Sequence, residues 1–136
     1  MLSENLQWDR FISENRWAVL TTLRNSGQPN SSVVAYARDG DELVISTPGA
    51  TFKRASIEAD ERVNLCVISN AEPFNFVAIE AKAMVTRAQL EADTRKVFAN
   101  IAGSGHTVPD NLPQWLEQQS RVILRLSPVR IYGVIR

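Results

Sequence analysis

The order of hydrophobic and polar positions indicates a chain built mainly of β-strands. Apolar residues alternate loosely with polar ones over several short segments, and this period of two is typical of strands with one buried face. The predicted strands cover residues 17–24, 30–38, 42–47, 62–69, 74–87 and 121–136, the last interrupted by Ser127 and Pro128. The segment 62–69 (RVNLCVIS) is largely apolar, so we expect it to be buried on both faces.

Turn residues separate these strands. Residues 25–29 (NSGQP) predict a turn because Asn and Gly tolerate positive φ, while Pro29 restricts the chain that leaves the turn. Residues 39–41 (DGD) predict a tight hairpin, since Asp-Gly favours the type I′ geometry of two-residue loops. We therefore expect the strands to pair antiparallel.

Four further segments predict helices, at residues 3–14, 52–60, 88–102 and 114–119. Ser3 and Thr51 are the expected N-caps of the first two, and Gly103 ends the third. A length of 136 residues fits a single domain, residues 1–136. The predicted fold is mainly β with peripheral helices: an antiparallel barrel of six or seven strands.

Composition narrows the class of protein. The formal net charge is zero, whereas a duplex nucleic-acid partner usually requires a strongly basic face. Cys66 is the only cysteine, which excludes a disulfide scaffold and indicates a reducing compartment. The first residues lack the apolar core of a signal peptide, and no apolar run is long enough for a membrane span. We expect a soluble, cytoplasmic protein.

Few residues offer direct chemistry. His106 is the only histidine, which excludes a multi-histidine metal site, and its Gly-rich surroundings predict an ordinary loop residue. Cys66 lies within an apolar strand and is expected to be a buried core thiol rather than a nucleophile. No pair of carboxylates stands out for acid–base work. The sequence therefore predicts neither a catalytic side chain nor a metal site.

The segment 46–54 (STPGATFKR) is the strongest candidate for a binding site. It leads from a strand through a glycine turn into a helix, where hydroxyls and free backbone N–H groups can hold an anion. Lys53 and Arg54 place two positive charges in the first helical turn, which is unfavourable for the helix dipole. A bound phosphate would reverse that sign. By spacing alone, a solvated basic pair is the better interpretation.

Phe74 and Phe76 form a second candidate feature. Two aromatic residues at a spacing of two project from the same face of a strand. They could flank a planar ring, and they could equally fill the core or a dimer interface, which is the favoured interpretation.

Taken together, these segments resemble a known family. The order WAVLTTLR, NSGQP, NSSVVAYA, ELVIST, PG, ATFKR and ERVNLCVIS is similar to the pyridoxamine 5′-phosphate oxidase-like split β-barrel proteins. The stretches KVFANIAGSGH and RVILRLSPVRIYG resemble the actinobacterial branch that binds the deazaflavin coenzyme F420. The resemblance spans nearly the whole chain. It implies a homodimer with two cofactor sites at the subunit interface.

The resemblance also implies roles for individual residues. Lys53 would bind the cofactor phosphate, and Phe74 and Phe76 would approach the site from the neighbouring subunit. Arg54 stands where the family often has a small residue, so its role is an extension of the resemblance. Many relatives have Pro or Asn near position 33, where Val33 removes a polar contact to the ring. The remaining implied residues are Ser46, Thr47 and Thr51 on the phosphate loop and Ser32, Val33 and Val34 beside the ring.

The function implied is F420-dependent hydride transfer between the deazaflavin and a small organic substrate. Three alternatives remain: an FMN-dependent oxidoreductase, a non-catalytic cofactor-binding or storage protein, and a haem-binding protein. The last is the poorest, because His106 is the only imidazole available. The long acidic tail of F420 requires additional basic side chains, for which Arg121 and Arg125 are candidates. The sequence does not indicate the substrate.

Overall fold

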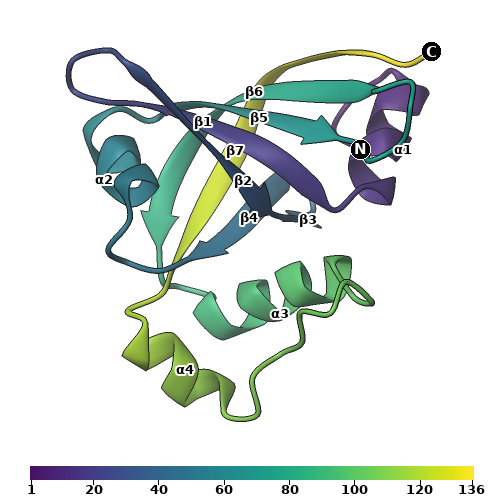
Figure 1. Cartoon of the computed structure of the whole chain (residues 1–136). Helices are drawn as coiled ribbons and strands as arrows, with labels where there is room; N and C mark the ends of the chain where they lie inside the picture. The colour runs from purple at the N-terminus through teal and green to yellow at the C-terminus, as the bar shows by residue number, and fades with distance from the viewer.

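Seven strands form a single antiparallel sheet in the order β2-β1-β5-β6-β7-β4-β3 (Figure 1). The computed structural model describes all residues 1–136. The strands are β1 (Trp17–Leu23), β2 (Pro29–Ala35), β3 (Ala37–Asp39), β4 (Glu42–Thr47), β5 (Arg62–Ile68), β6 (Phe76–Thr86) and β7 (Val122–Val134). The helices are α1 (Leu6–Glu14), α2 (Phe52–Ala59), α3 (Leu90–Asn100) and α4 (Leu112–Gln118). The predicted mainly β fold with peripheral helices is confirmed.

Tyr36 explains why the sheet curls. The predicted strand 30–38 is divided at this residue into β2 and β3, which lie at opposite edges of the sheet. One residue joins them, so the two edges must come close together. The Tyr36 side chain is fully buried, and its hydroxyl donates to the carbonyls of Ile12 (2.6 Å) and Asn15 (2.9 Å). Burial raises the pKa of this phenol and keeps it neutral.

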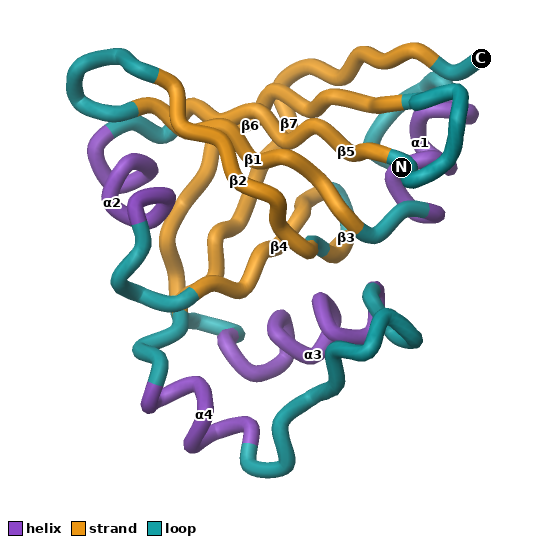
Figure 2. Tube along the Cα trace, in the orientation of Figure 1, coloured by secondary structure: helices purple, strands orange, loops and turns teal.

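The inner face of the curled sheet holds the main hydrophobic core. Alternate residues of every strand except β3 point inward, and Phe11 and Ile12 of α1 and Ile57 of α2 pack among them. α3 instead packs on the outer side of β3, β4 and β7, where Val97 meets a second, smaller cluster. Figure 2 shows α3 and α4 as a layer outside the barrel. None of the four helices has the length and hydropathy of a membrane-spanning segment.

The prediction for residues 62–69 was wrong in one respect. Val63, Leu65 and Val67 are buried, whereas Asn64 and Cys66 on the opposite face are only half-buried. The reason is that α1 and α2 pack into the inner core, so no helix covers the outer face of β5. Cys66 is therefore not a core residue, although partial burial still raises the pKa of its thiol.

Three smaller expectations are corrected. Asn5, not Ser3, caps α1, because its side chain accepts from the N–H groups of Gln7 and Trp8. The β3–β4 loop is Gly40-Asp41, and only Gly40 has a positive φ, as in type II′ rather than type I′ turns. Strand β7 continues through Ser127 and Pro128, and a register shift opposite Glu80 and Ala81 absorbs the irregularity.

Candidate cofactor-binding site

The loop between β4 and α2 is fixed at both ends. Thr51 caps α2 by accepting from the N–H of Arg54, as expected from the sequence. The Gly49 N–H donates to the carbonyl of Gln119 at 3.3 Å. A side chain at Gly49 would collide with the carbonyl of Ser120, so only glycine permits this close approach. The turn before β7 thus positions the first turn of α2, whose N–H groups favour an anion.

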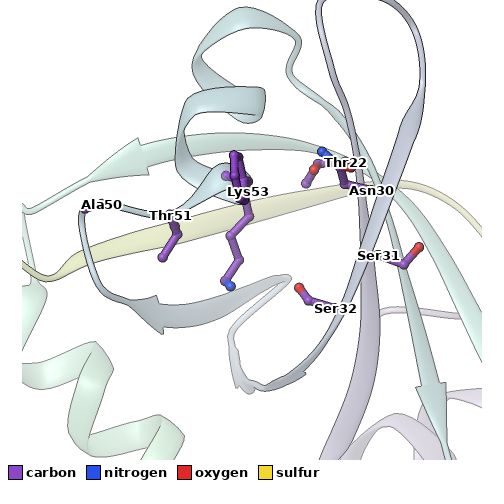
Figure 3. Close-up of a pocket in the computed structure, with 8 residues that line it drawn as sticks. Thr22, Asn30, Ser31, Ser32, Ala50, Thr51 and Lys53 are labelled. Carbon is purple, nitrogen blue, oxygen red and sulfur yellow. The ribbon is translucent and has the colours of Figure 1, made fainter.

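A cavity of about 600 Å³ opens beside this helix start. Figure 3 shows the side chain of Lys53 extending from α2 across the cavity toward Ser32 of β2. Most of the lining side chains are polar, and one is a cation. The lining residues are Thr22, Asn30, Ser31, Ser32, Ala50, Thr51, Phe52 and Lys53.

Inward-facing polar residues form one wall of this cavity. Along β1 the core-facing positions change from Ala18 and Leu20 to Thr22, and along β2 the polar residues Asn30 and Ser32 precede buried Val34. The side-chain nitrogen of Asn30 is buried and has no hydrogen-bond partner within the chain. A buried donor without an acceptor is costly, so this wall fits a ligand that carries acceptor atoms.

Positive charge at the site is not neutralised by the chain itself. Lys53 is half-buried and takes part in no salt bridge; the nearby Arg121 also lacks a carboxylate partner. Burial, and then the charge of Arg121, lower the pKa of Lys53. Burial also lowers the pKa of Arg121. Both shifts show that the folded chain disfavours these charges without a counter-ion, so the site is suited to an anion.

Three of the predicted cofactor residues, Ser32, Thr51 and Lys53, meet at this cavity. Arg54 lies outside it: its Nε donates to Glu58 at 2.9 Å and its Nη1 to the carbonyl of Gly49 at 3.4 Å. Arg54 therefore stabilises the loop between β4 and α2 from outside the cavity.

Ser46 and Thr47 also lie beyond the lining of the Lys53 cavity. The Ser46 hydroxyl accepts from Thr94 at 2.9 Å, and its carbonyl accepts from Arg121 at 3.1 Å. The Thr47 hydroxyl is buried without a partner near the end of β4.

The remaining predicted residues are dispersed within one chain. Val34 is buried in the core, whereas Val33 is 66% exposed on the opposite side of β2. Phe76 begins β6, and Phe74 is exposed just before it. Neither aromatic residue lines the Lys53 cavity of its own chain.

Sequence analysis missed Thr22, Asn30 and Ser31, and it gave no individual role to Ala50 and Phe52 of the candidate segment 46–54. For Thr22 and Asn30 a signal exists: each places a polar side chain at a core-facing position of an alternating strand. Phe52 is 80% exposed and stands at the rim, and no sequence pattern distinguishes it from an ordinary helix residue.

The two arginines considered for an acidic tail differ sharply. Arg125 is surrounded by carboxylates: it donates to Asp39 at 2.7 Å, to Glu42 at 3.3 Å and to Asp93. Its charge is therefore neutralised within the fold. Arg121 remains the one of the two without a carboxylate partner.

A sequence model described as pyridoxamine 5′-phosphate oxidase matches residues 6–135. The chain belongs to this family. The strand order and the curl of the sheet are those of the split β-barrel typical of pyridoxamine 5′-phosphate oxidase-like proteins.

Solved structures share this pyridoxamine 5′-phosphate oxidase-like fold at low sequence identity. A protein described as F420 reductase is 19% identical, with a TM-score of 0.73 over 91% of this chain and 94% of that one. A conserved hypothetical protein of Mycobacterium tuberculosis, Rv2991, is 22% identical, with a TM-score of 0.77 over 98% and 84%. A heme-binding protein of Mycobacterium smegmatis is 16% identical, with a TM-score of 0.75 over 94% and 52%.

Proposed function

We propose that the chain is an oxidoreductase that binds coenzyme F420 and transfers a hydride between the deazaflavin and a small organic substrate. The observation that carries the proposal is the uncompensated ammonium group of Lys53 in a polar cavity at the start of α2. Membership in the pyridoxamine 5′-phosphate oxidase family and the likeness to an F420 reductase support it.

In this proposal, Lys53 and the N–H groups of the first turn of α2 hold the phosphate. The planar ring lies along β2. This strand pairs only with β1, so backbone N–H and C=O groups along its other edge are free to bond the polar edge of a ring. Ser32, Val33 and Val34 would present those groups.

The chain's own part in the reaction is binding and orientation. The cofactor ring supplies hydride transfer, so no side chain needs to act as a general acid or base. This role agrees with a cavity lined by hydroxyl, amide and ammonium groups and by no carboxylate.

We further propose a homodimer. Phe76 begins β6 and Phe74 lies just before it, and both lie outside the Lys53 cavity of their own chain. A second copy would bring its own pair of aromatic rings against the planar cofactor.

FMN is the second candidate cofactor. Its shorter tail ends at a single phosphate, which Lys53 and the N–H groups at the start of α2 could bind without further basic side chains. Arg125, a candidate for a longer acidic tail, is already bound by Asp39, Glu42 and Asp93. Haem is a poorer candidate, although a heme-binding protein shares the fold. The only imidazole, His106, lies on an exposed loop outside the Lys53 cavity.

Equilibrium binding of F420 and of FMN to the purified full chain tests the proposal. We expect F420 to bind more tightly. Tight FMN binding without F420 binding would identify FMN, rather than F420, as the cofactor. Absence of binding by either would reject the proposal. Turnover is then measured with a panel of electrophilic alkenes, quinones and nitro compounds. Cofactor binding without any turnover would support the storage alternative.

A further inference from the structure

A second cavity, of about 270 Å³, lies under α3 and α4 on the outer side of the barrel. It shares no lining residue with the Lys53 cavity. Its walls come from the starts of β1 and β7, the ends of β2 and β4, and the two helices. The lining residues are Trp17, Ala35, Ser46, Val97, Phe98, Ile101, His106, Trp115 and Arg121.

Flat aromatic surfaces dominate this second cavity. Trp17 meets the ring of His106 edge-on, with centroids 6.3 Å apart, and Phe98 meets Trp115 in the same way at 6.0 Å. Aromatic faces and edges favour another ring placed in offset or perpendicular contact. The walls therefore suit a planar aromatic molecule better than a flexible aliphatic one.

Arg121 gives this cavity a positive charge. The guanidinium lies 4.1 Å from the centroid of the Trp115 ring, donates from Nε to Gln119 at 2.7 Å, and donates from Nη1 to the carbonyl of Ser46 at 3.1 Å. Both partners are neutral, and Nη2 makes no hydrogen bond within the chain. A fixed, half-buried cation with an unused donor is suited to an anionic oxygen.

The two cavities lie at different points along β2. Ser31, Val33 and Ala35 lie on the same side of β2. Ser31 lines the Lys53 cavity, and Ala35 lines the second cavity. Val33 lies between them and is exposed. A ring held along β2 over Val33 would therefore lie between the two cavities, with the second cavity at its Ala35 end.

We propose that the second cavity binds a planar aromatic anion of one or two rings, with its carboxylate or phenolate oxygen at Arg121. Its assignment as the substrate subsite rests on the proposed function, because the cofactor ring must lie over Val33 for the two to react. The binding of the anion itself does not depend on the cofactor. The volume is slightly below the range of roughly 300–1,000 Å³ for drug-sized ligands, which favours a small molecule.

Calorimetric titration of the full chain without cofactor tests the binding. The probe is 2-naphthoate, compared with 2-naphthylmethylamine, which carries the opposite charge, and with cyclohexanecarboxylate, which lacks the aromatic ring. We expect saturable binding of naphthoate, at least about tenfold tighter than that of either analogue. Equal binding of all three would overturn the proposal.

Two variants test whether naphthoate binds in the second cavity. Arg121→Gln and Phe98→Ala should each weaken naphthoate binding by at least about tenfold, whereas Lys53→Ala should leave it unchanged. Melting curves establish whether each variant is folded. If Arg121→Gln does not fold, naphthoate binding by Phe98→Ala decides the test. Unchanged naphthoate binding in the folded variants would reject the site.

Cofactor titrations of the same proteins separate the two proposals. If Arg121→Gln weakens F420 binding and leaves naphthoate binding unchanged, the guanidinium serves the cofactor tail and the second cavity is not an anion site. If naphthoate binds but neither F420 nor FMN does, the oxidoreductase proposal fails while the aromatic anion site stands.

Discussion

At the scale of single residues, Lys53 has the most informative environment. Its charge opposes the dipole of α2, is half-buried, and lacks a carboxylate partner. Each of these conditions disfavours the charged ammonium group in the unliganded protein. A bound anion would stabilise that charge. An ordinary surface lysine such as Lys82, which is 63% exposed and lies 3.8 Å from Glu61, has no comparable conflict.

Replacing Lys53 with alanine should therefore weaken cofactor binding. We expect a loss of about 1.5–3 kcal/mol, the scale of a charge-assisted hydrogen bond. Titration of F420 and FMN into both proteins measures the loss, and Lys82→Ala serves as the matched control, with no expected change. Unchanged affinity in Lys53→Ala would place the phosphate elsewhere.

The lowered pKa of Lys53 also predicts a pH dependence. Because burial and Arg121 disfavour the charged form, Lys53 loses its proton at a lower pH than an ordinary lysine. Affinity for the phosphate should fall as the pH rises through this lowered pKa. Without ligand the sign is opposite: the unfolded chain holds the proton more tightly, so stability increases over the same interval.

Dissociation constants measured from pH 7 upward test this dependence, since the phosphate of FMN is already largely dianionic above pH 7. Lys53→Arg keeps its charge throughout and should show a flat profile. A parallel decline in both proteins would assign the titration to another group.

At the scale of elements, the attachment of α3 to the barrel depends on Arg125. This β7 residue joins Asp93 of α3 to Asp39 and Glu42 beside the β3–β4 turn, and Lys96 bonds Asp39 at 2.7 Å. The pKa of Asp39 is lowered, first by its hydrogen bond to Lys96 and then by that to Arg125. Because α3 forms a wall of the second cavity, this cluster also supports its shape.

Arg125→Met should be strongly destabilising, because it leaves the fully buried carboxylate of Asp93 without its guanidinium partner. Loss of one partner from a buried ion pair costs about 3–5 kcal/mol. Urea unfolding measures the change. Arg95→Met, on the same helix, removes only an exposed pair with Glu91 and should cost below about 1 kcal/mol. Similar losses in both variants would contradict this account of α3.

At the scale of the whole molecule, the outer face of β1, β5 and β6 has no helix over it. Val19, Cys66 and Ala78 are paired across these strands and share this face, with Tyr132 of β7 beside Ala78. The apolar sequence of β5 predicted burial on both sides, and the single chain covers only one. A second copy placed on this face would account for that composition.

We therefore expect a homodimer in solution that buries more than about 1,000 Å² in total. Val19→Arg, which places a charge in the centre of this face, should shift the protein to monomers in light scattering. The control variant Leu6→Arg also replaces an apolar residue with arginine, at a position on α1 that is 66% exposed, and should leave the dimer intact. A monomeric wild-type protein would contradict the shared-site proposal.

The sequence by itself determined the features that depend on neighbouring residues. The alternation of strands, the Thr51 cap and the basic first turn of α2 are local, and the structure contains each of them. Lys53 could be singled out for the same reason, because its conflict with the helix dipole is visible in a few residues of sequence. The roles assigned through the family resemblance remain predictions.

Tertiary structure decided what depends on residues far apart in the chain. Nothing local distinguishes Arg121 from Arg125; Arg125 meets Asp39, 86 positions away, whereas Arg121 meets no carboxylate. Burial of Tyr36 divides one predicted strand into the two edges of the sheet, and the resulting curl brings Asn30 and Ser32 opposite Lys53. Charge compensation and sheet closure are set by distances in space, which hydrophobic periodicity along the chain does not encode.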